Sequence, residues 1–350
     1  MTMHFIELKA RRDALLAEEP RLRARDLAVK LGISEAELVA LGRDNAEATR
    51  LKPEWFSIIA DVPSLGYVMA LTRNESCVHE RKGVYGDLGG DARVALIVGE
   101  DIDLRIFFSH WRFGFGVVET TENGLRRSLQ FFDAAGDAIH KIYLTDKSDA
   151  AAFDRLVAKW ASDEPRAQLS IEVLPAREAV RPNSEIDVPG FHAAWDSLRD
   201  THEFHGLLNK FKVQRVQGLR LAGTRRAMPV DAATLRRVLS NAAARETPIM
   251  VFVGNPGMIQ IHTGPVSNLK PMGPWFNVLD EKFNLHLRED HIASAWIVWK
   301  PTEDGVVTSL ELFDAQGDAI ATLFGKRKPG QAEDEAWRAI VADALAEVAA

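Results

Sequence analysis

Apolar residues recur at helical spacing near the start of the chain and alternate with polar residues in the segments that follow. Residues 4–17 and 25–31 carry apolar side chains every three or four positions, which predicts two amphipathic helices. Ser34 followed by Glu37 is a capping box and predicts that a third helix begins there. Short apolar or alternating segments, separated by Gly, Asn and Asp, then predict strands at 66–71, 77–80, 94–98, 104–108, 113–119 and 128–132.

The turns between these strands indicate how they pair. Asn-Gly at 123–124 and Asp-Gly at 304–305 are strong signals for two-residue hairpin turns, because both dipeptides tolerate positive φ. Helical patterns at 150–160 and 331–348 follow the strand regions. Short strands joined by hairpins form antiparallel sheets, and helices kept apart from the strands indicate the α+β class rather than α/β. We therefore expect large antiparallel sheets flanked by helices.

The chain repeats itself at a constant shift of 181 positions. The sequence FDAAGDAI begins at Phe132, and FDAQGDAI begins at Phe313. A period of this length is that of a duplicated domain rather than a solenoid, so each half is expected to be one copy of the same unit. The same shift, without a gap, pairs Asn74 with Asn255, Gly83 with Gly264, His110 with His291 and Gly124 with Gly305.

A proline-rich stretch separates the two copies. Proline-rich, partly charged segments of this kind are typical of linkers. The four prolines are Pro165, Pro175, Pro182 and Pro189. We expect an N-terminal repeat at residues 1–163, a linker at 164–190 and a C-terminal repeat at 191–350.

Composition narrows the class of protein. The 350 residues are 46% hydrophobic and 27% charged, as in soluble globular proteins. Lys and Arg number 43 against 50 Asp and Glu, and the net charge of −7 argues against a general affinity for nucleic acid or anionic membranes. The single cysteine, Cys77, excludes an internal disulfide framework. The sequence has no signal-peptide pattern and no run of 18 apolar residues, so we expect a cytoplasmic protein without stable membrane insertion.

Candidate chemistry lies where the two copies differ, because a duplicated fold keeps its packing residues in both. The segment FHAAWDSLRDTHEFHGLLNKFK at 191–212 predicts one helix with His202 and His205 on its apolar, buried-facing stripe. The equivalent positions in the first copy are Arg21 and Ala24. A histidine on such a stripe is usually a hydrogen-bonded core residue, but imidazole is also the commonest metal ligand. The spacing alone leaves both interpretations open.

Three cations are further candidates. Arg105, in DIDLRIFFSHW, has His286 as its counterpart, and Lys300, in WIVWKPTEDG, has Glu119. Arg327, in FGKRKPG, belongs to the second copy as well. Arg105 is either paired with a nearby Asp or is a fixed cation aimed into a cleft. Lys300 and Arg327 are either solvated surface residues or members of a site.

Several long stretches resemble one known family. They are FHAAWDSLRDTHEFHGLLNKFKVQRVQGLR, DIDLRIFFSHW, and FNLHLREDHIASAWIVWKPTEDGVVTSLELFDAQGDAI with the following FGKRKPG. These stretches resemble the bacterial haemin-degrading factors, also called haemin transport proteins, which are cytoplasmic partners of haem-uptake transporters. The resemblance covers nearly the whole chain, including its duplication. It implies that two large antiparallel sheets are flanked by helices, with a haem cleft between the halves.

The resemblance also implies roles for individual residues. The proximal histidine of the family falls on His202, and His205 matches an alternative axial histidine of some members. The distal arginine falls on Arg105, which is the catalytic candidate if the protein is an enzyme. At Ala321 the chain lacks a tyrosine that many members carry. The basic residues near the haem propionates match Arg215, Lys300 and Arg327, and the aromatic residues of the pocket match Phe107 and Phe252.

These residue types suit haem b on chemical grounds. Haem is an apolar disc with two carboxylates and an iron, so its site needs an imidazole, an apolar slot and cations at one edge. The resemblance implies a protein that accepts imported haem, with a haem-uptake transporter and a downstream acceptor or oxygenase as partners. Oxidative degradation is the alternative and needs O₂ and an external electron donor, because GVYGDLGG is not a G-x-G-x-x-G motif. We favour carriage, although the sequence does not separate the two.

Two alternatives come from other classes of protein. Residues 24–42 are similar to a helix-turn-helix, but the would-be recognition helix carries Glu35 and Glu37 and no Lys or Arg, so it would repel phosphate. A bare metal ion held by His202 and His205 is the other alternative, and two histidines are too few ligands for it. We expect neither nucleic acid nor a bare metal ion as the ligand.

Overall fold

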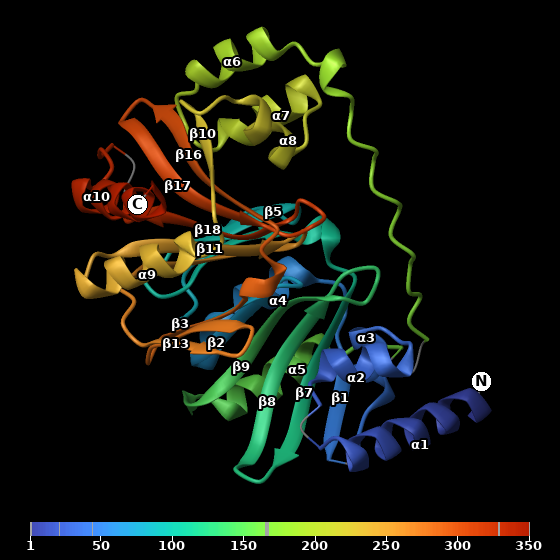
Figure 1. Ribbon diagram of the computed structural model, residues 1–350. Helices are drawn as coiled ribbons and strands as arrows, with labels where there is room; N and C mark the ends of the chain where they lie inside the picture. Colours follow the sequence, from blue (N-terminus) through green and yellow to red (C-terminus); the bar gives the residue numbers. More distant parts are fainter. Residues whose placement is uncertain (1, 21, 44, 165–167, 328–329, 350) are drawn as a thin grey trace. The chain divides into compact units, whose positions relative to one another are not determined.

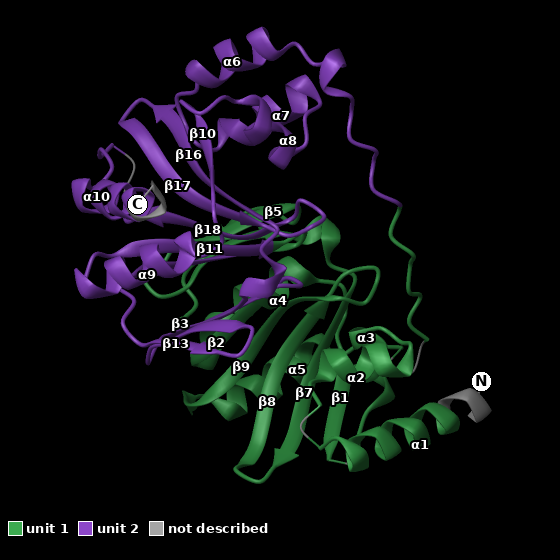
Figure 2. Ribbon diagram, viewed as in Figure 1, with its two compact units in different colours: residues 1–72, 82–175, 255–259 green, residues 73–81, 176–254, 260–350 purple. Residues whose placement is uncertain are grey.

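The computed structural model describes residues 2–20, 22–43, 45–164, 168–327 and 330–349, which form two compact units (Figures 1 and 2). Unit 1 consists of Met1–Thr72, Lys82–Pro175 and Asn255–Ile259, and unit 2 consists of Arg73–Arg81, Ala176–Gly254 and Gln260–Ala350. The division expected from the sequence gave each half of the chain to one unit. In the structure, each unit also contains one short segment from the other half of the sequence.

Unit 1 combines a five-stranded antiparallel sheet with helices. The strand order is β1-β7-β8-β9-β2, and a second group of strands has the order β6-β5-β4. The helices are α1 (Thr2–Glu18), α2 (Ala24–Leu31), α3 (Glu35–Leu41), α4 (Trp55–Asp61) and α5 (Ala150–Trp160). The strands are β1 (Ala46–Arg50), β2 (Gly66–Arg73), β4 (Gly89–Gly90), β5 (Val94–Ile97), β6 (Asp103–Phe107), β7 (Phe113–Thr121), β8 (Gly124–Phe132) and β9 (Ala138–Ser148).

Unit 2 repeats this plan. Its five-stranded antiparallel sheet has the order β10-β16-β17-β18-β11, and a second group has the order β3-β15-β14-β13. The helices are α6 (Val188–Asp196), α7 (Glu203–Phe211), α8 (Arg215–Leu221), α9 (Thr234–Ala244) and α10 (Glu335–Ala349). The strands are β10 (Ala227–Val230), β11 (Ile249–Asn255), β13 (Leu269–Met272), β14 (Trp275–Leu279), β15 (Phe283–Arg288), β16 (Ser294–Thr302), β17 (Gly305–Phe313) and β18 (Ala319–Gly325). Along the chain, β3 (Cys77–Val84) and β12 (Met258–Gly264) each pass from one unit to the other.

The duplication and the α+β class are confirmed. Strands β7 and β16, and likewise β8 and β17, have bounds that differ by 181 positions at both ends. The capping box that begins α3 is also present, because the Ser34 hydroxyl accepts the Glu37 N–H and the Glu37 carboxylate accepts the Ser34 N–H. The hairpin turns lie one residue earlier than expected. Gly124 and Gly305, with φ of 106° and 112°, already pair with the preceding strands.

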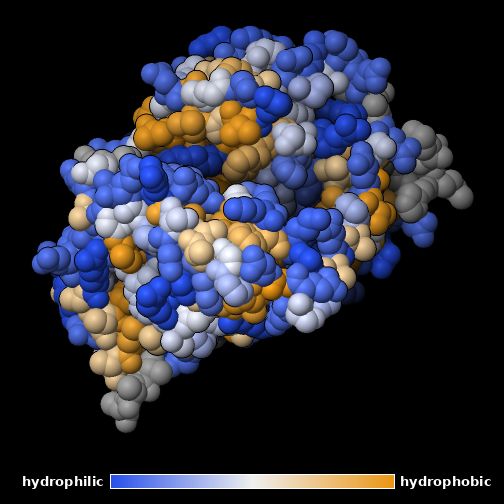
Figure 3. All heavy atoms as spheres, turned by 90° about the horizontal axis from the view of Figure 1, so that it is seen from above, coloured by the Kyte–Doolittle hydropathy of each residue, from blue (hydrophilic) through white to orange (hydrophobic). Residues whose placement is uncertain are grey.

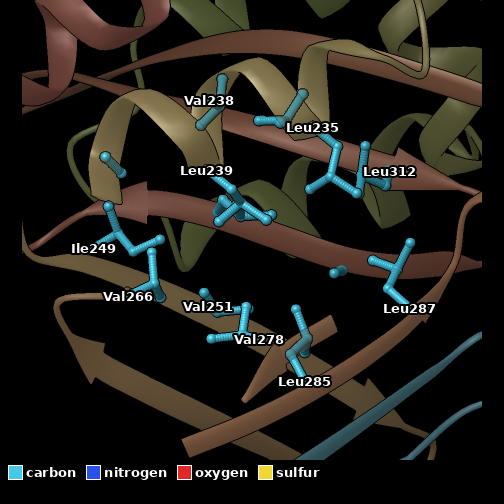
Figure 4. Packing of buried hydrophobic residues seen from close by; sticks show 14 of the residues in the cluster. Leu235, Val238, Leu239, Ile249, Val251, Val266, Val278, Leu285, Leu287 and Leu312 are labelled. Atoms are coloured by element: carbon cyan, nitrogen blue, oxygen red, sulfur yellow. The ribbon is translucent and has the colours of Figure 1, made fainter. Parts of the chain in front are cut away.

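One face of the unit 2 sheet packs against α9 and α10. Figure 4 shows Leu235 and Leu239 of α9 above Val251 of β11, with Leu312 of β17 to the right of Leu239. The other face of this sheet packs against α6, α7 and α8 through a separate apolar cluster that includes Phe191, Trp195, Phe204, Trp296, Val298 and Phe313. Strand residues alternate between the two clusters, as the period of two requires. The second face is the one that carries the candidate site.

Within the described residues, no helix is both long and apolar enough to cross a membrane. Some large hydrophobic side chains nevertheless remain exposed, including Val94, Leu96 and Val98 on or next to β5. Hydrophobic patches lie among hydrophilic side chains on the face of the molecule that Figure 3 shows.

Candidate functional site

The segment at 191–212 forms two helices rather than one. Helix α6 ends at Asp196, and α7 begins at Glu203. In the turn between them, the Glu203 carboxylate accepts the Arg199 N–H at 2.8 Å, and Asp200 Oδ1 accepts the His202 N–H at 2.8 Å. Acidic side chains that accept backbone N–H groups favour the beginning of a new helix. The prediction of one continuous helix is therefore wrong.

This turn also places the two histidines outside the core. The His202 side chain is 86% exposed, and His205 on α7 is exposed as well. The prediction that both lie on the buried-facing stripe is wrong, because the new helix begins in a different register. The buried residues of α7 are Phe204, Leu207 and Leu208.

Asp200 orients the His202 imidazole. The Nδ1 of His202 lies 2.6 Å from Oδ1 of Asp200. The N–H of the His202 backbone is the main cause that lowers the pKa of Asp200, and the positive charge of Arg327 lowers it further. An ionised carboxylate can only accept, so Nδ1 donates, and in the neutral imidazole Nε2 then carries the lone pair. Among the described residues Nε2 has no hydrogen-bond partner, and it is thus available to bind a metal centre.

Phe252 lies on the same face of the sheet as the residues beneath α7. Phe252 of β11 is opposite Thr322 of β18, which is opposite Glu311 of β17. Residues directly opposite one another in an antiparallel sheet share a face, and two strand spacings amount to about 10 Å. Phe252 packs edge-on against Phe324, with ring centroids 5.1 Å apart, and both rings are half-buried. The two rings give this part of the sheet an apolar, aromatic surface.

A buried group of charges lies on the same face. Lys300 Nζ is 2.6 Å from Glu311 Oε1, and Arg215 Nε is 2.9 Å from Glu311 Oε2. Both cations also lie over the ring of Phe204, with Lys300 Nζ 4.5 Å and Arg215 Cζ 5.2 Å from its centroid. Burial raises the pKa of Glu311, but the two cations outweigh it and bring this pKa down to about 2. The Glu311 carboxylate is therefore ionised.

Two of the three expected propionate-binding cations, Lys300 and Arg215, differ in accessibility. The Lys300 side chain is 3% exposed and bound to Glu311, so the structure does not present its ammonium group at the surface. The Arg215 side chain is 34% exposed and contacts Glu311 through only Nε and Nη2. Of the two, Arg215 is the one that can reach a ligand.

Arg327 is a third cation in unit 2. Its Nη2 lies 3.9 Å from Asp304 Oδ2 in the turn between β16 and β17. Its Nη1 is buried and makes no hydrogen bond within the described residues. A buried guanidinium nitrogen without a partner is costly and fits a site for an anionic group. Ala321, where many family members carry a tyrosine, is buried in the core.

Arg105 and Phe107 lie on β6 of unit 1. Arg105 Nη1 donates to the carboxylate of Asp103 and, at 3.1 Å, to the Leu104 carbonyl. Burial raises the pKa of Asp103, while the bond from Arg105 opposes this shift. Arg105 thus has the nearby aspartate partner that the sequence left as one interpretation, yet its side chain is still 34% exposed. Arg105 and Phe107 pair directly with Leu96 and Val94 of β5, both of which are exposed.

Four side chains of the site were not predicted, namely Asp200, Phe204, Glu311 and Phe324. For Glu311 a signal existed. The shift of 181 places Gln130 opposite Glu311 and Glu119 opposite Lys300, so the second copy alone has opposite charges at these two positions. Asp200, Phe204 and Phe324 depend on the broken helix and on strand register, which the sequence pattern did not supply.

The helix at 35–41 and the groups of His, Cys, Asp and Glu side chains bear on the two alternative interpretations. Glu35 of α3 is buried, and its carboxylate lies 3.5 Å from Lys141 Nζ in unit 1. Glu35 is therefore a packing residue of unit 1 rather than a surface charge of this helix. In the described part of the chain, no group of three or more His, Cys, Asp or Glu side chains could hold a bare metal ion.

A family model described as the haemin-degrading HemS.ChuX domain matches the chain twice, at residues 32–160 and 212–344. The chain belongs to this family. The double match agrees with the duplication, and the resemblance seen in the sequence is confirmed.

Similar members of the family are named for haem transport. The chain is 41% identical over 323 residues to the hemin transport protein HemS of Yersinia enterocolitica, covering 92% of each chain. It is also 41% identical over 327 residues to the hemin transport protein HmuS of Yersinia pestis, covering 93% of this chain and 94% of that protein.

Solved structures of family members have the same fold. Holo-PhuS, a heme-binding protein from Pseudomonas aeruginosa, is 46% identical with a TM-score of 0.94, covering 96% of this chain and 98% of PhuS. ChuS, described as an Escherichia coli heme oxygenase, is 36% identical with a TM-score of 0.86, covering 97% and 99%. Family membership is thus compatible with both carriage and degradation.

Proposed function

We propose that this protein binds haem b through His202 and carries it as cargo. The pairing of His202 with Asp200 is the observation on which the proposal depends, because it leaves Nε2 available at the surface. Half-buried Phe252 offers an apolar face to a porphyrin, and Arg215 and Arg327 offer donors to its carboxylates. Relatives named as heme-binding and hemin transport proteins support the same ligand.

The exposure of the His202 side chain favours carriage of haem over its permanent retention. A carrier must release haem, and an axial histidine that lies at the surface can exchange its iron without unfolding its surroundings. His205, three residues further along and also exposed, is proposed as a second resting position during transfer. The source would be a haem-uptake transporter, the destination a haem acceptor or oxygenase, and the compartment the cytoplasm.

Oxidative degradation is the second candidate, and the similarity to ChuS, described as a heme oxygenase, favours it. Arg105 would then be the residue acting on iron-bound oxygen, and it remains a proposed haem-binding residue together with Phe107. An external electron donor would be required in that case.

Titration of the protein with ferric haem, followed by visible absorption, tests the ligand. His202→Ala should shift the Soret band and the spin-state bands, and the double change with His205→Ala should remove histidine ligation. His110→Ala is the matched control, since His110 is an exposed histidine of unit 1. If the double variant retains the wild-type spectrum, another residue holds the iron and the proposal is wrong.

A further inference from the structure

Glu311 is the only charged residue of β17 (Gly305–Phe313). It lies between Leu310 and Leu312 on β17, and its side chain is fully buried. It accepts from Lys300 at 2.6 Å and from Arg215 at 2.9 Å, and Ser309 Oγ donates to it at 3.1 Å. Burying a carboxylate is costly unless it is paired. The two cations explain how the core tolerates the charge of Glu311, but they do not explain why the second copy has a carboxylate there.

The charges in this group do not cancel. Lys300 and Glu311 are both buried and neutralise one another, whereas Arg215 adds a second positive charge with its side chain partly exposed. Glu311 contacts Nε and Nη2 of Arg215, and Nη1 has no hydrogen-bond partner among the described residues. A guanidinium held along one edge keeps its remaining N–H groups in a fixed direction.

The first copy of the repeat carries a neutral version of the same arrangement. Gln130 and Ser128 occupy the positions equivalent to Glu311 and Ser309, and Gln130 Nε2 donates to Ser128 Oγ at 3.0 Å. The sheet therefore accepts a glutamine at this position. The charge of Glu311 is a property of the second copy, the copy that also carries His202.

We propose that Glu311 is a positioning residue, which fixes Arg215 so that its free edge receives one carboxylate of the ligand. Lys300 acts through Glu311 and contacts no ligand: it compensates the buried negative charge, which leaves the charge of Arg215 available. This inference rests on the proposed function. It assigns recognition of one haem propionate to the pair Glu311 and Arg215.

The test compares ferric haem with its dimethyl ester, which lacks the carboxylate charge. Glu311→Gln should lower the affinity for haem about tenfold or more, the loss expected for one charge-assisted bond, and should leave the affinity for the ester unchanged. Ser309→Ala is the matched control, because it removes one hydrogen bond to Glu311 and keeps both cations. The preference of this control for haem over the ester should equal that of the wild type.

A second variant shows whether Glu311 acts through Arg215. Arg215→Lys keeps the charge but has no rigid fork, so it should lose the same preference, and adding Glu311→Gln to it should cause no further loss. If Glu311→Gln folds poorly, Glu311→Asp takes its place, because it keeps the charge but draws the carboxylate back from Arg215, and it should lose the same preference. Equal losses for haem and ester, or a stronger preference for haem in Glu311→Gln, would overturn the inference. A wild type whose spectrum does not depend on His202 would instead overturn the proposed function.

Discussion

Arg81 and His262 occupy equivalent positions in the two repeats, and their side chains meet inside unit 2. Arg81 Nη1 lies 3.2 Å from His262 Nδ1, and the His262 ring stacks on Phe283 at 3.8 Å with an interplanar angle of 5°. The contact exists because residues 73–81 of the first half belong to unit 2, where β3 pairs with β15. The second half of the chain is therefore an incomplete unit by itself.

We expect residues 176–350 alone to be markedly less stable than the same fragment joined to the missing strand. Without residues 73–81, β15 loses one of its two neighbouring strands, and Cys77 is removed from the core that contains Leu285. Fusing residues 73–84 to the fragment through a Gly/Ser linker should raise the midpoint of thermal unfolding, measured by circular dichroism. A fusion with the same twelve residues in scrambled order is the control. Equal midpoints for the two fusions would contradict the strand assignment.

Buried histidines should make the protein sensitive to mild acid. Burial lowers the pKa of His140 in unit 1 and of His262 in unit 2 to about 3. In the unfolded chain these groups titrate near pH 6.5, so the unfolded state binds more protons below that pH. The stability that each neutral histidine contributes is complete above about pH 6.5 and falls towards pH 3, by about 1.4 kcal/mol per pH unit at most. Urea unfolding at pH 7 and pH 5 measures this loss.

A variant with changes in unit 1 isolates the part of this acid-dependent loss of stability that is due to His140. Its Nδ1 lies 2.9 Å from the Thr72 hydroxyl, and its Nε2 lies 2.6 Å from the Tyr85 hydroxyl. The second copy has apolar side chains at the three equivalent positions, Val253, Val266 and Ala321. Replacing the network with Thr72→Val, Tyr85→Phe and His140→Leu should reduce the loss of stability between pH 7 and pH 5. His110→Leu, at an exposed position, should leave this loss unchanged.

Asp200→Asn should weaken haem binding about 10- to 100-fold, the usual effect of losing the partner of a ligating histidine. Asparagine keeps the shape of Asp200 and can still cap the His202 N–H, but its neutral oxygen is a weaker acceptor for Nδ1–H. Asp196→Asn is the control, because Asp196 pairs with Arg225 and Arg226 instead. The affinity for ferric haem, from absorption titration, is the measurement. An unchanged affinity in Asp200→Asn would show that the Asp200 carboxylate does not strengthen the bond between His202 and the haem iron.

Features set by local pattern could be predicted from the sequence, and features set by long-range contacts could not. The capping box of Ser34 and Glu37 depends on neighbouring residues, and it is confirmed. The shift of 181 positions between the repeated hairpins is confirmed as well, although their turns lie one residue earlier than the sequence predicted. The break before His202 was missed, because apolar spacing continues across it while acidic side chains bind the backbone there.

The candidate site shows the same division. Its residue types could be predicted from the differences between the copies and from the family resemblance. The partner of Lys300 could not be predicted, because strand register determines it. Glu311 lies opposite Trp296, and the side chain of Lys300 reaches Glu311 along the same face of the sheet. The exchange of residues 73–81 is also a matter of strand pairing, which apolar periodicity does not encode.

Arg105→Ala separates carriage from degradation. If the protein is a catalyst, Arg105 stabilises charge on iron-bound oxygen, and removing one such preorganised donor typically lowers a rate about 100- to 1000-fold. Haem breakdown with O₂ and an electron donor should then nearly vanish, while ferric haem still binds through His202. Because Arg105 already pairs with Asp103, Asp103→Asn is the matched control that keeps the cation and removes its partner.

If the protein is a carrier, as we favour, the same experiment gives a different pattern. Breakdown by the wild type should be slow, should depend on free peroxide and should be suppressed by catalase. Arg105→Ala should then chiefly change the rate at which haem passes to an acceptor such as apomyoglobin, followed by absorption. Conversion to a single tetrapyrrole product that is stoichiometric and insensitive to catalase would contradict carriage as the main role. In that case the exposed imidazole of His202 would bind haem as the substrate of a reaction rather than as cargo for transfer to an acceptor.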